Sequence, residues 1–95
     1  LLGALDIFAD INQESYKFVA RVMFENNLLS AAFNYMQKSK DIYYNDAELH
    51  FMLMRYYIKV HDFEQAYFYA NECLQLIPDY YPALAMKQKI EENYL

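Results

Sequence analysis

Glycine and proline are scarce in this 95-residue chain, which holds one Gly and two Pro. A sheet protein with many hairpins needs these residues at its turns, so an all-β fold is disfavoured. Hydrophobic residues make up 57% of the chain and charged residues 22%, which is not the composition of a disordered segment. The sequence therefore describes one small folded domain, or a piece of a larger one.

Basic residues and cysteine are also few. The net charge is −5 and no run of Lys or Arg is present to neutralise phosphates, so we expect no nucleic-acid partner. The single Cys73 excludes an internal disulfide and fits a reducing compartment. Every apolar stretch is too short to cross a bilayer, so we expect a cytoplasmic protein without membrane insertion.

Residues 47–80 carry the pattern of a helical hairpin. Their apolar residues recur at spacings of three and four, which predicts two amphipathic helices. Asp62 stands between them as an N-cap, with Gln65 placed to close a capping box, and Pro78 ends the second helix. The predicted inward residues are Leu49, Met52, Leu53, Tyr56, Tyr57, Val60, Phe63, Ala66, Tyr67, Ala70, Cys73, Leu74 and Ile77.

The same pattern stands 34 residues earlier, over residues 13–46. Its predicted inward residues are Tyr16, Val19, Ala20, Met23, Ala32, Tyr35, Met36, Ser39 and Ile42. Four positions are identical in the two units: Glu14 and Glu48, Arg21 and Arg55, Ala32 and Ala66, Tyr35 and Tyr69. A period of this length predicts stacked repeat units.

The flanks extend the repeat. Residues 1–12 resemble the end of a preceding unit's second helix, and because the chain begins with Leu1 rather than Met we expect a longer array upstream. Residues 81–95 are predicted to form a capping helix that buries Ala83, Met86 and Ile90. Pro82 suits the first turn of that helix, where its missing N–H costs nothing.

These residues resemble the tetratricopeptide repeat family, whose pattern is W-x2-L-G-x2-Y, A-x3-F and P. The second unit has His50, Leu53, Met54 and Tyr57, then Ala66 and Ala70, then Pro78 in that register. The first unit has Tyr16, Val19, Ala20 and Met23, then Ala32 and Met36, then Tyr44. The resemblance implies an all-α fold, a right-handed α-solenoid of antiparallel helix-turn-helix repeats. Met54 departs from the family's Gly and is bulky for a close helix crossing.

In this family the first helix of each unit lines a groove that binds a partner peptide, so the resemblance implies a protein–protein interaction or scaffolding module. The implied groove residues are Lys17, Arg21 and Phe24 in the first unit and Phe51, Arg55, Ile58 and Lys59 in the second. Alternatively, Arg21 and Arg55 pair with the neighbouring Glu14, Glu25 or Glu48 and keep this face soluble. The family's carboxylate clamp for chaperone tails is not expected, because Arg21 and Met52 stand where it needs Asn.

No catalytic constellation is visible. One glycine cannot form a phosphate-binding loop, and His50 and His61 lack the spacing of a metal pair. His50 is interpreted as a packing residue, His61 as a turn residue and Cys73 as a small buried side chain. We therefore expect no enzyme activity, cofactor or metal in these residues.

The alternative function is an accessory or dimerisation domain of a larger enzyme, such as a bacterial glycosyltransferase, or of a regulator. Self-association would then use the N-terminal edge, around Leu1, Leu2, Leu5 and Phe8.

Overall fold

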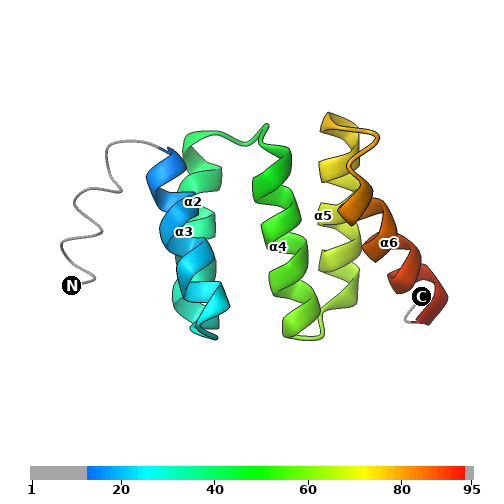
Figure 1. Ribbon diagram of the computed structural model, residues 1–95, viewed down its shortest axis with the longest axis horizontal. Helices are drawn as coiled ribbons and strands as arrows, with labels where there is room; N and C mark the ends of the chain where they lie inside the picture. The colour runs from blue at the N-terminus through cyan, green and yellow to red at the C-terminus, as the bar shows by residue number, and fades with distance from the viewer. Residues whose placement is uncertain (1–12, 94–95) are drawn as a thin grey trace. The chain divides into compact units, whose positions relative to one another are not determined.

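The computed structural model describes residues 13–93, which form α-helices joined by short turns (Figure 1). The helices are α2 (Gln13–Glu25), α3 (Leu29–Ile42), α4 (Ala47–Lys59), α5 (Phe63–Leu76) and α6 (Tyr81–Asn93). No strand occurs in this range, so the predicted all-α class is confirmed. The predicted remnant helix over 1–12 lies outside the described residues.

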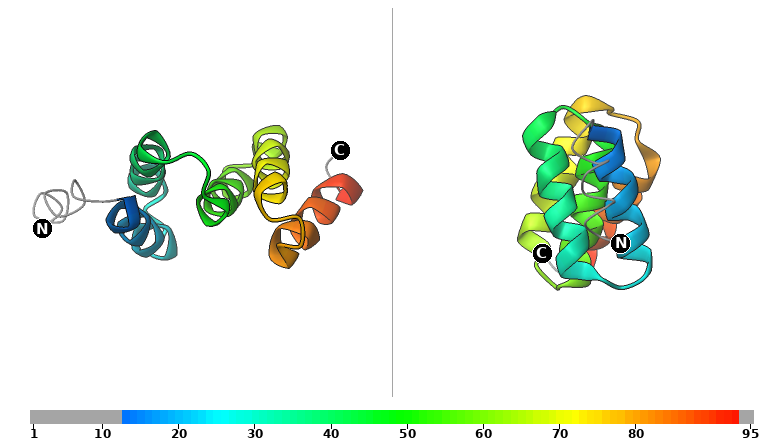
Figure 2. Two further views of the ribbon diagram at one scale, coloured as in Figure 1. Left: turned by 90° about the horizontal axis from the view of Figure 1, so that it is seen from above. Right: turned by 90° about the vertical axis from the view of Figure 1, so that its left-hand side faces the viewer.

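The chain divides into two compact units, with the boundary between Tyr44 and Asn45. The N-terminal unit contains the hairpin of α2 and α3, and the C-terminal unit contains the hairpin of α4 and α5, followed by α6. Within each hairpin the two helices run antiparallel and pack along their length (Figures 1 and 2).

The helix boundaries recur with a 34-residue offset. α2 spans 13–25 and α4 spans 47–59, while α3 spans 29–42 and α5 spans 63–76. The C-terminal end of the first helix and both ends of the second helix therefore repeat. Short side chains allow the helices of a hairpin to approach closely, and the predicted small residues have no exposed surface. They are Ala20, Ala32 and Ser39 in the first hairpin and Ala66, Ala70 and Cys73 in the second.

The turn of the first hairpin closes through two backbone hydrogen bonds. The Leu28 N–H donates to the Met23 carbonyl at 2.8 Å, and the Asn27 N–H donates to the Phe24 carbonyl at 3.0 Å. This is the Schellman pattern, which requires a left-handed residue just past the helix. Asn27 fills that position with φ 65°.

The second hairpin repeats this turn. The Asp62 N–H donates to the Tyr57 carbonyl at 2.9 Å, and the His61 N–H donates to the Ile58 carbonyl at 3.1 Å. His61 has φ 62°, a conformation that costs a side chain with a Cβ about 1–2 kcal/mol. The turn residue predicted from the sequence is thus a residue under backbone strain.

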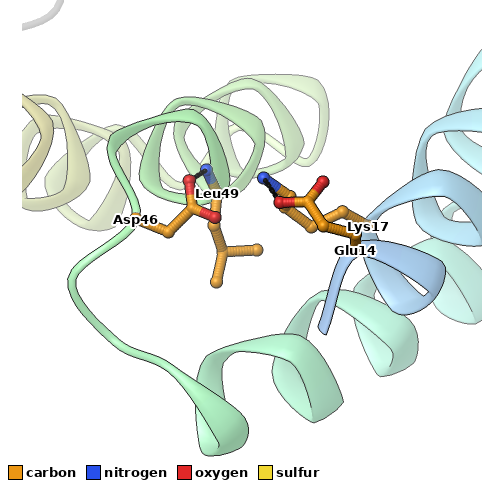
Figure 3. Close-up of polar contacts among 4 residues, drawn as sticks. All are labelled: Glu14, Lys17, Asp46 and Leu49. Atoms are coloured by element: carbon orange, nitrogen blue, oxygen red, sulfur yellow. Dashed lines mark hydrogen bonds and ion pairs between the residues drawn. The ribbon is translucent and has the colours of Figure 1, made fainter. Parts of the chain in front are cut away.

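Aspartate N-caps begin α4 and α5. The Asp46 carboxylate accepts the Leu49 N–H at 3.2 Å (Figure 3), and the Asp62 carboxylate accepts the Gln65 N–H at 3.3 Å. The predicted cap at Asp62 is therefore present. The reciprocal half of the predicted capping box is not formed, because the Asp62 N–H already donates to the Tyr57 carbonyl.

A ring pair at equivalent positions joins the two helices in each hairpin. The Tyr16 and Tyr35 ring centroids lie 5.9 Å apart, and those of His50 and Tyr69 lie 5.7 Å apart. His50 follows Tyr16 by 34 residues, and Tyr69 follows Tyr35 by the same number. The repeat therefore conserves a specific contact as well as helix length.

Three apolar residues predicted to point inward are exposed: Ile42, Val60 and Ile77. Ile42 is the last residue of α3, and the other two are the C-cap residues of α4 and α5. Helical spacing no longer sets side-chain direction where the helix ends, so extrapolating the period to these positions was wrong. Met54, in contrast, is completely buried at the position where the first hairpin has Ala20.

Helix α6 covers α5 with few apolar side chains. Ala83 joins Ala47 and Cys73 in one buried cluster, and Ile90 is also buried. Polar contacts supplement this packing. The Tyr67 hydroxyl donates to the Glu91 carboxylate at 2.6 Å, which raises the pKa of Tyr67, and the Lys87 ammonium lies 5.6 Å from the Tyr67 ring centroid.

Replacing Ala66 tests the close crossing of the second hairpin. Because Ala66 has no exposed surface, Ala66→Leu should lower the free energy of unfolding by about 1–3 kcal/mol through overpacking. Ala85→Leu on exposed α6 surface is the matched control and should change it by less than about 0.5 kcal/mol. Equal denaturation midpoints for both variants would show that the register is wrong.

Replacing His61 tests the turn strain. His61→Gly should leave stability unchanged or raise it by up to about 1 kcal/mol, since glycine adopts positive φ without a steric cost. The control Lys89→Gly, at an exposed position inside α6, should lower stability by about 1 kcal/mol. Equal losses in chemical denaturation for the two glycine variants would rule out the strained turn.

Candidate interaction surface

The first helix of each hairpin contains the residues predicted to contact a partner. Arg21 on α2 and Arg55 on α4 are both exposed, and Lys59 is exposed in the last turn of α4. The two arginines occupy equivalent positions, each the ninth residue of its helix. Each helix therefore carries an exposed arginine at the same point of the repeat.

Lys17 and Phe24 are not available at the surface. Their exposed fractions are 4% and 7%, so the expectation that both side chains face a partner does not fit their burial. The Lys17 ammonium pairs with the Glu14 carboxylate at 2.9 Å, one helical turn earlier (Figure 3). Side chains three residues apart on a helix are close enough to form this ion pair. The Glu14 side chain is exposed to solvent, whereas the Lys17 side chain is buried.

Phe51 and Ile58 on α4 are half-buried. The Phe51 ring lies 5.3 Å from the Tyr80 ring, centroid to centroid, and packs against the cluster of Ala47, Cys73 and Ala83. Phe51 therefore connects α4 with the turn that precedes α6. Only part of the Phe51 side chain and part of the Ile58 side chain are accessible to a partner.

Two exposed apolar residues on α2 were not among the predicted surface residues. Phe18 is 59% exposed and Val22 is 43% exposed, one helical turn apart. The helical period places Phe18 on the far side of the helix from the buried Tyr16 and Met23, so the sequence contained the signal for its exposure. The prediction named Phe24 as the apolar residue of α2 at the surface and omitted Phe18 and Val22.

The two histidines are structural. His50 is fully buried and stacks on Tyr69 with an interplanar angle of 22°, in agreement with the packing interpretation. His61 lies in the turn, where its ring meets that of Phe63 edge-on. Within residues 13–93, no group of three or more His, Cys, Asp or Glu side chains could hold a metal ion.

Cys73 lies near the C-terminal end of α5, packs in the cluster with Ala47 and Ala83, and has no exposed surface. Burial raises the pKa of its thiol to about 11, so the thiolate that a nucleophile requires is almost absent at neutral pH. The side chain acts as a small core residue at a helix crossing.

None of the helices in the described part of the chain is long and apolar enough to cross a membrane. Comparison with protein-family models finds no matching family, and comparison with curated protein sequences finds no match. The resemblance to tetratricopeptide repeats therefore remains an expectation from the sequence.

Thiol labelling tests the position of Cys73. In the folded protein at pH 8, Ellman's reagent should react with Cys73 at least about a hundredfold more slowly than in denaturant, because the thiol is both buried and protonated. Rapid reaction without denaturant would contradict a closed second hairpin. Ser30→Cys, at an exposed position of α3, is the control and should add one rapidly reacting thiol.

Proposed function

We propose that the chain is a protein–protein interaction module of the tetratricopeptide type, whose hairpins belong to a right-handed α-solenoid. The support is the 34-residue recurrence of four features: helix boundaries, left-handed turn residue, inter-helix ring pair and small buried residues. Repeat proteins of this kind use surfaces on their helices to bind other proteins.

The exposed pair of equivalent arginines, Arg21 and Arg55, is the observation on which the proposed binding surface depends. Guanidinium groups bind carboxylates through two parallel hydrogen bonds. Lys59 adds positive charge near Arg55, and the half-buried Phe51 and Ile58 offer apolar contact. The partner that fits is an extended segment with acidic and apolar residues. Lys17 and Phe24 are omitted from this surface because they are buried.

Charge reversal tests the proposal. A fluorescent extended peptide with alternating Glu and Leu serves as the probe, and its binding is measured by anisotropy. Arg21→Glu/Arg55→Glu should weaken binding at least about tenfold, because each charge-assisted contact contributes on the order of 1.5–3 kcal/mol. Helicity by circular dichroism should not change, since both side chains are exposed.

Lys89→Glu is the control for net charge, compared with Arg55→Glu alone. Both replace one exposed cation by an anion, but Lys89 lies on α6. The proposal requires the Arg55 variant to lose affinity and the Lys89 variant to keep it. Equal losses in both variants, or no binding of the probe to the unmodified chain, would refute binding through the first helices.

A further inference from the structure

Helix α6 is held to the second hairpin by little apolar surface. Its buried residues are Ala83 and Ile90, and one of these is an alanine, whereas α4 buries six of its residues. A helix that buries few apolar side chains separates from its neighbours at a lower free energy than the core unfolds. We therefore expect α6 to leave the second hairpin while α4 and α5 remain folded.

Two contacts near opposite ends of α6 join it to the neighbouring α5 (Figure 1). In the first turn of α6, Ala83 packs in the buried cluster that contains Cys73 and Ala47. About two turns further along, the Glu91 carboxylate accepts a hydrogen bond from the Tyr67 hydroxyl at 2.6 Å. Glu91 is exposed, so this hydrogen bond breaks without the loss of any backbone hydrogen bond.

Tyr67 contacts the second half of α6 through both its hydroxyl and its ring. The hydroxyl donates to Glu91, and the Lys87 ammonium lies 5.6 Å from the ring centroid. Lys87 and Glu91 are four residues apart and therefore lie on one face of α6. A hydrogen bond to a carboxylate is stronger than one between neutral groups, and a cation near an aromatic face is also attracted to it. These contacts make Tyr67 the latch for this half of the helix.

The turn before α6 is anchored to α4. The Tyr80 ring lies 5.3 Å from the Phe51 ring, centroid to centroid, and the Tyr80 N–H donates to the Ile77 carbonyl at 3.1 Å. Between them Pro78 and Asp79 are exposed, so the turn has room to rotate. An element that is tethered at one end and held at the other by a surface contact can swing as a hinged body.

We propose that α6 is a hinged lid on the second hairpin, latched by the Tyr67–Glu91 hydrogen bond, and that its opening controls access to the interior around Cys73. In the closed state Ala83 packs in the same buried cluster as Cys73. When α6 swings away, the thiol becomes accessible while α4 and α5 stay paired. The lid uses none of the residues of the proposed binding surface except Phe51 at its anchor, so the arginine variants leave it unchanged.

Reaction of Cys73 with Ellman's reagent at pH 8 measures the opening, because only open molecules expose the thiol. Tyr67→Phe should raise the reaction rate about three- to tenfold, since it removes the hydrogen bond to Glu91 and keeps the ring. Tyr81→Phe removes the hydroxyl of an exposed tyrosine on α6 and is the matched control, which should leave the rate unchanged. Equal rates for the two variants would overturn the latch.

Low concentrations of urea distinguish lid opening from global unfolding. Undocking of one helix exposes little surface, so the rate should change by less than about twofold between 0 and about 1 M urea. Reaction through global unfolding would instead accelerate at least about fivefold over this range, because the whole chain becomes exposed. That steeper dependence would overturn the lid.

A double variant tests whether Tyr67 and Glu91 act through one contact. Glu91→Ala should accelerate the reaction as Tyr67→Phe does, because each removes the same hydrogen bond. Tyr67→Phe/Glu91→Ala should then react within about twofold of either single variant. Accelerations that multiply in the double variant would show two independent effects and would overturn the proposed latch.

Discussion

Each hairpin depends on the close approach of its two helices, and an equivalent ring pair joins the two helices in both hairpins. Tyr16 meets Tyr35 in the first hairpin, and His50 meets Tyr69 in the second, with nearly equal centroid distances. Small residues beside these rings have no exposed surface, so the backbones come together without a gap. Aromatic pairs of this geometry stabilise the fold by more than the burial of their apolar area alone.

The two hairpins reach the same geometry with different side chains. Ala20 and Met54 occupy equivalent positions and both are completely buried, although methionine is much larger. An unbranched thioether can adapt to an irregular space, which explains how the second hairpin tolerates it where the family pattern has Gly. Likewise Asn27 and His61 both adopt the left-handed turn conformation, which asparagine accepts more easily than histidine. The repeat therefore keeps its helix lengths and turn conformation while it tolerates different side chains at this buried position and in the turn.

Much of the fold could be predicted from the sequence. The recurrence of apolar residues at intervals of three and four predicted all five described helices. The N-cap at Asp62 was predicted from its position between two of these helices. The exposure of Ile42, Val60 and Ile77 was not predictable by the same rule, because helical periodicity stops where the helix does. For the candidate surface, the exposure of Arg21 and Arg55 agrees with the pattern, whereas the burial of Lys17 needed coordinates. From the sequence alone, a lysine one helical turn from a glutamate is expected to be exposed. Its burial depends on how other residues pack around its aliphatic chain, which the sequence pattern does not show.

The ring pairs give the most direct test of the repeated hairpin. Nuclear Overhauser spectroscopy on protein with selectively labelled aromatic residues should show cross-peaks between the Tyr16 and Tyr35 rings and between the His50 and Tyr69 rings, since the centroids lie 5.9 Å and 5.7 Å apart. Both sets should appear together, because they are the same contact in two units. Helical chemical shifts over α2–α5 with either set missing, or with these rings contacting others instead, would contradict the 34-residue repeat as the basis of the structure.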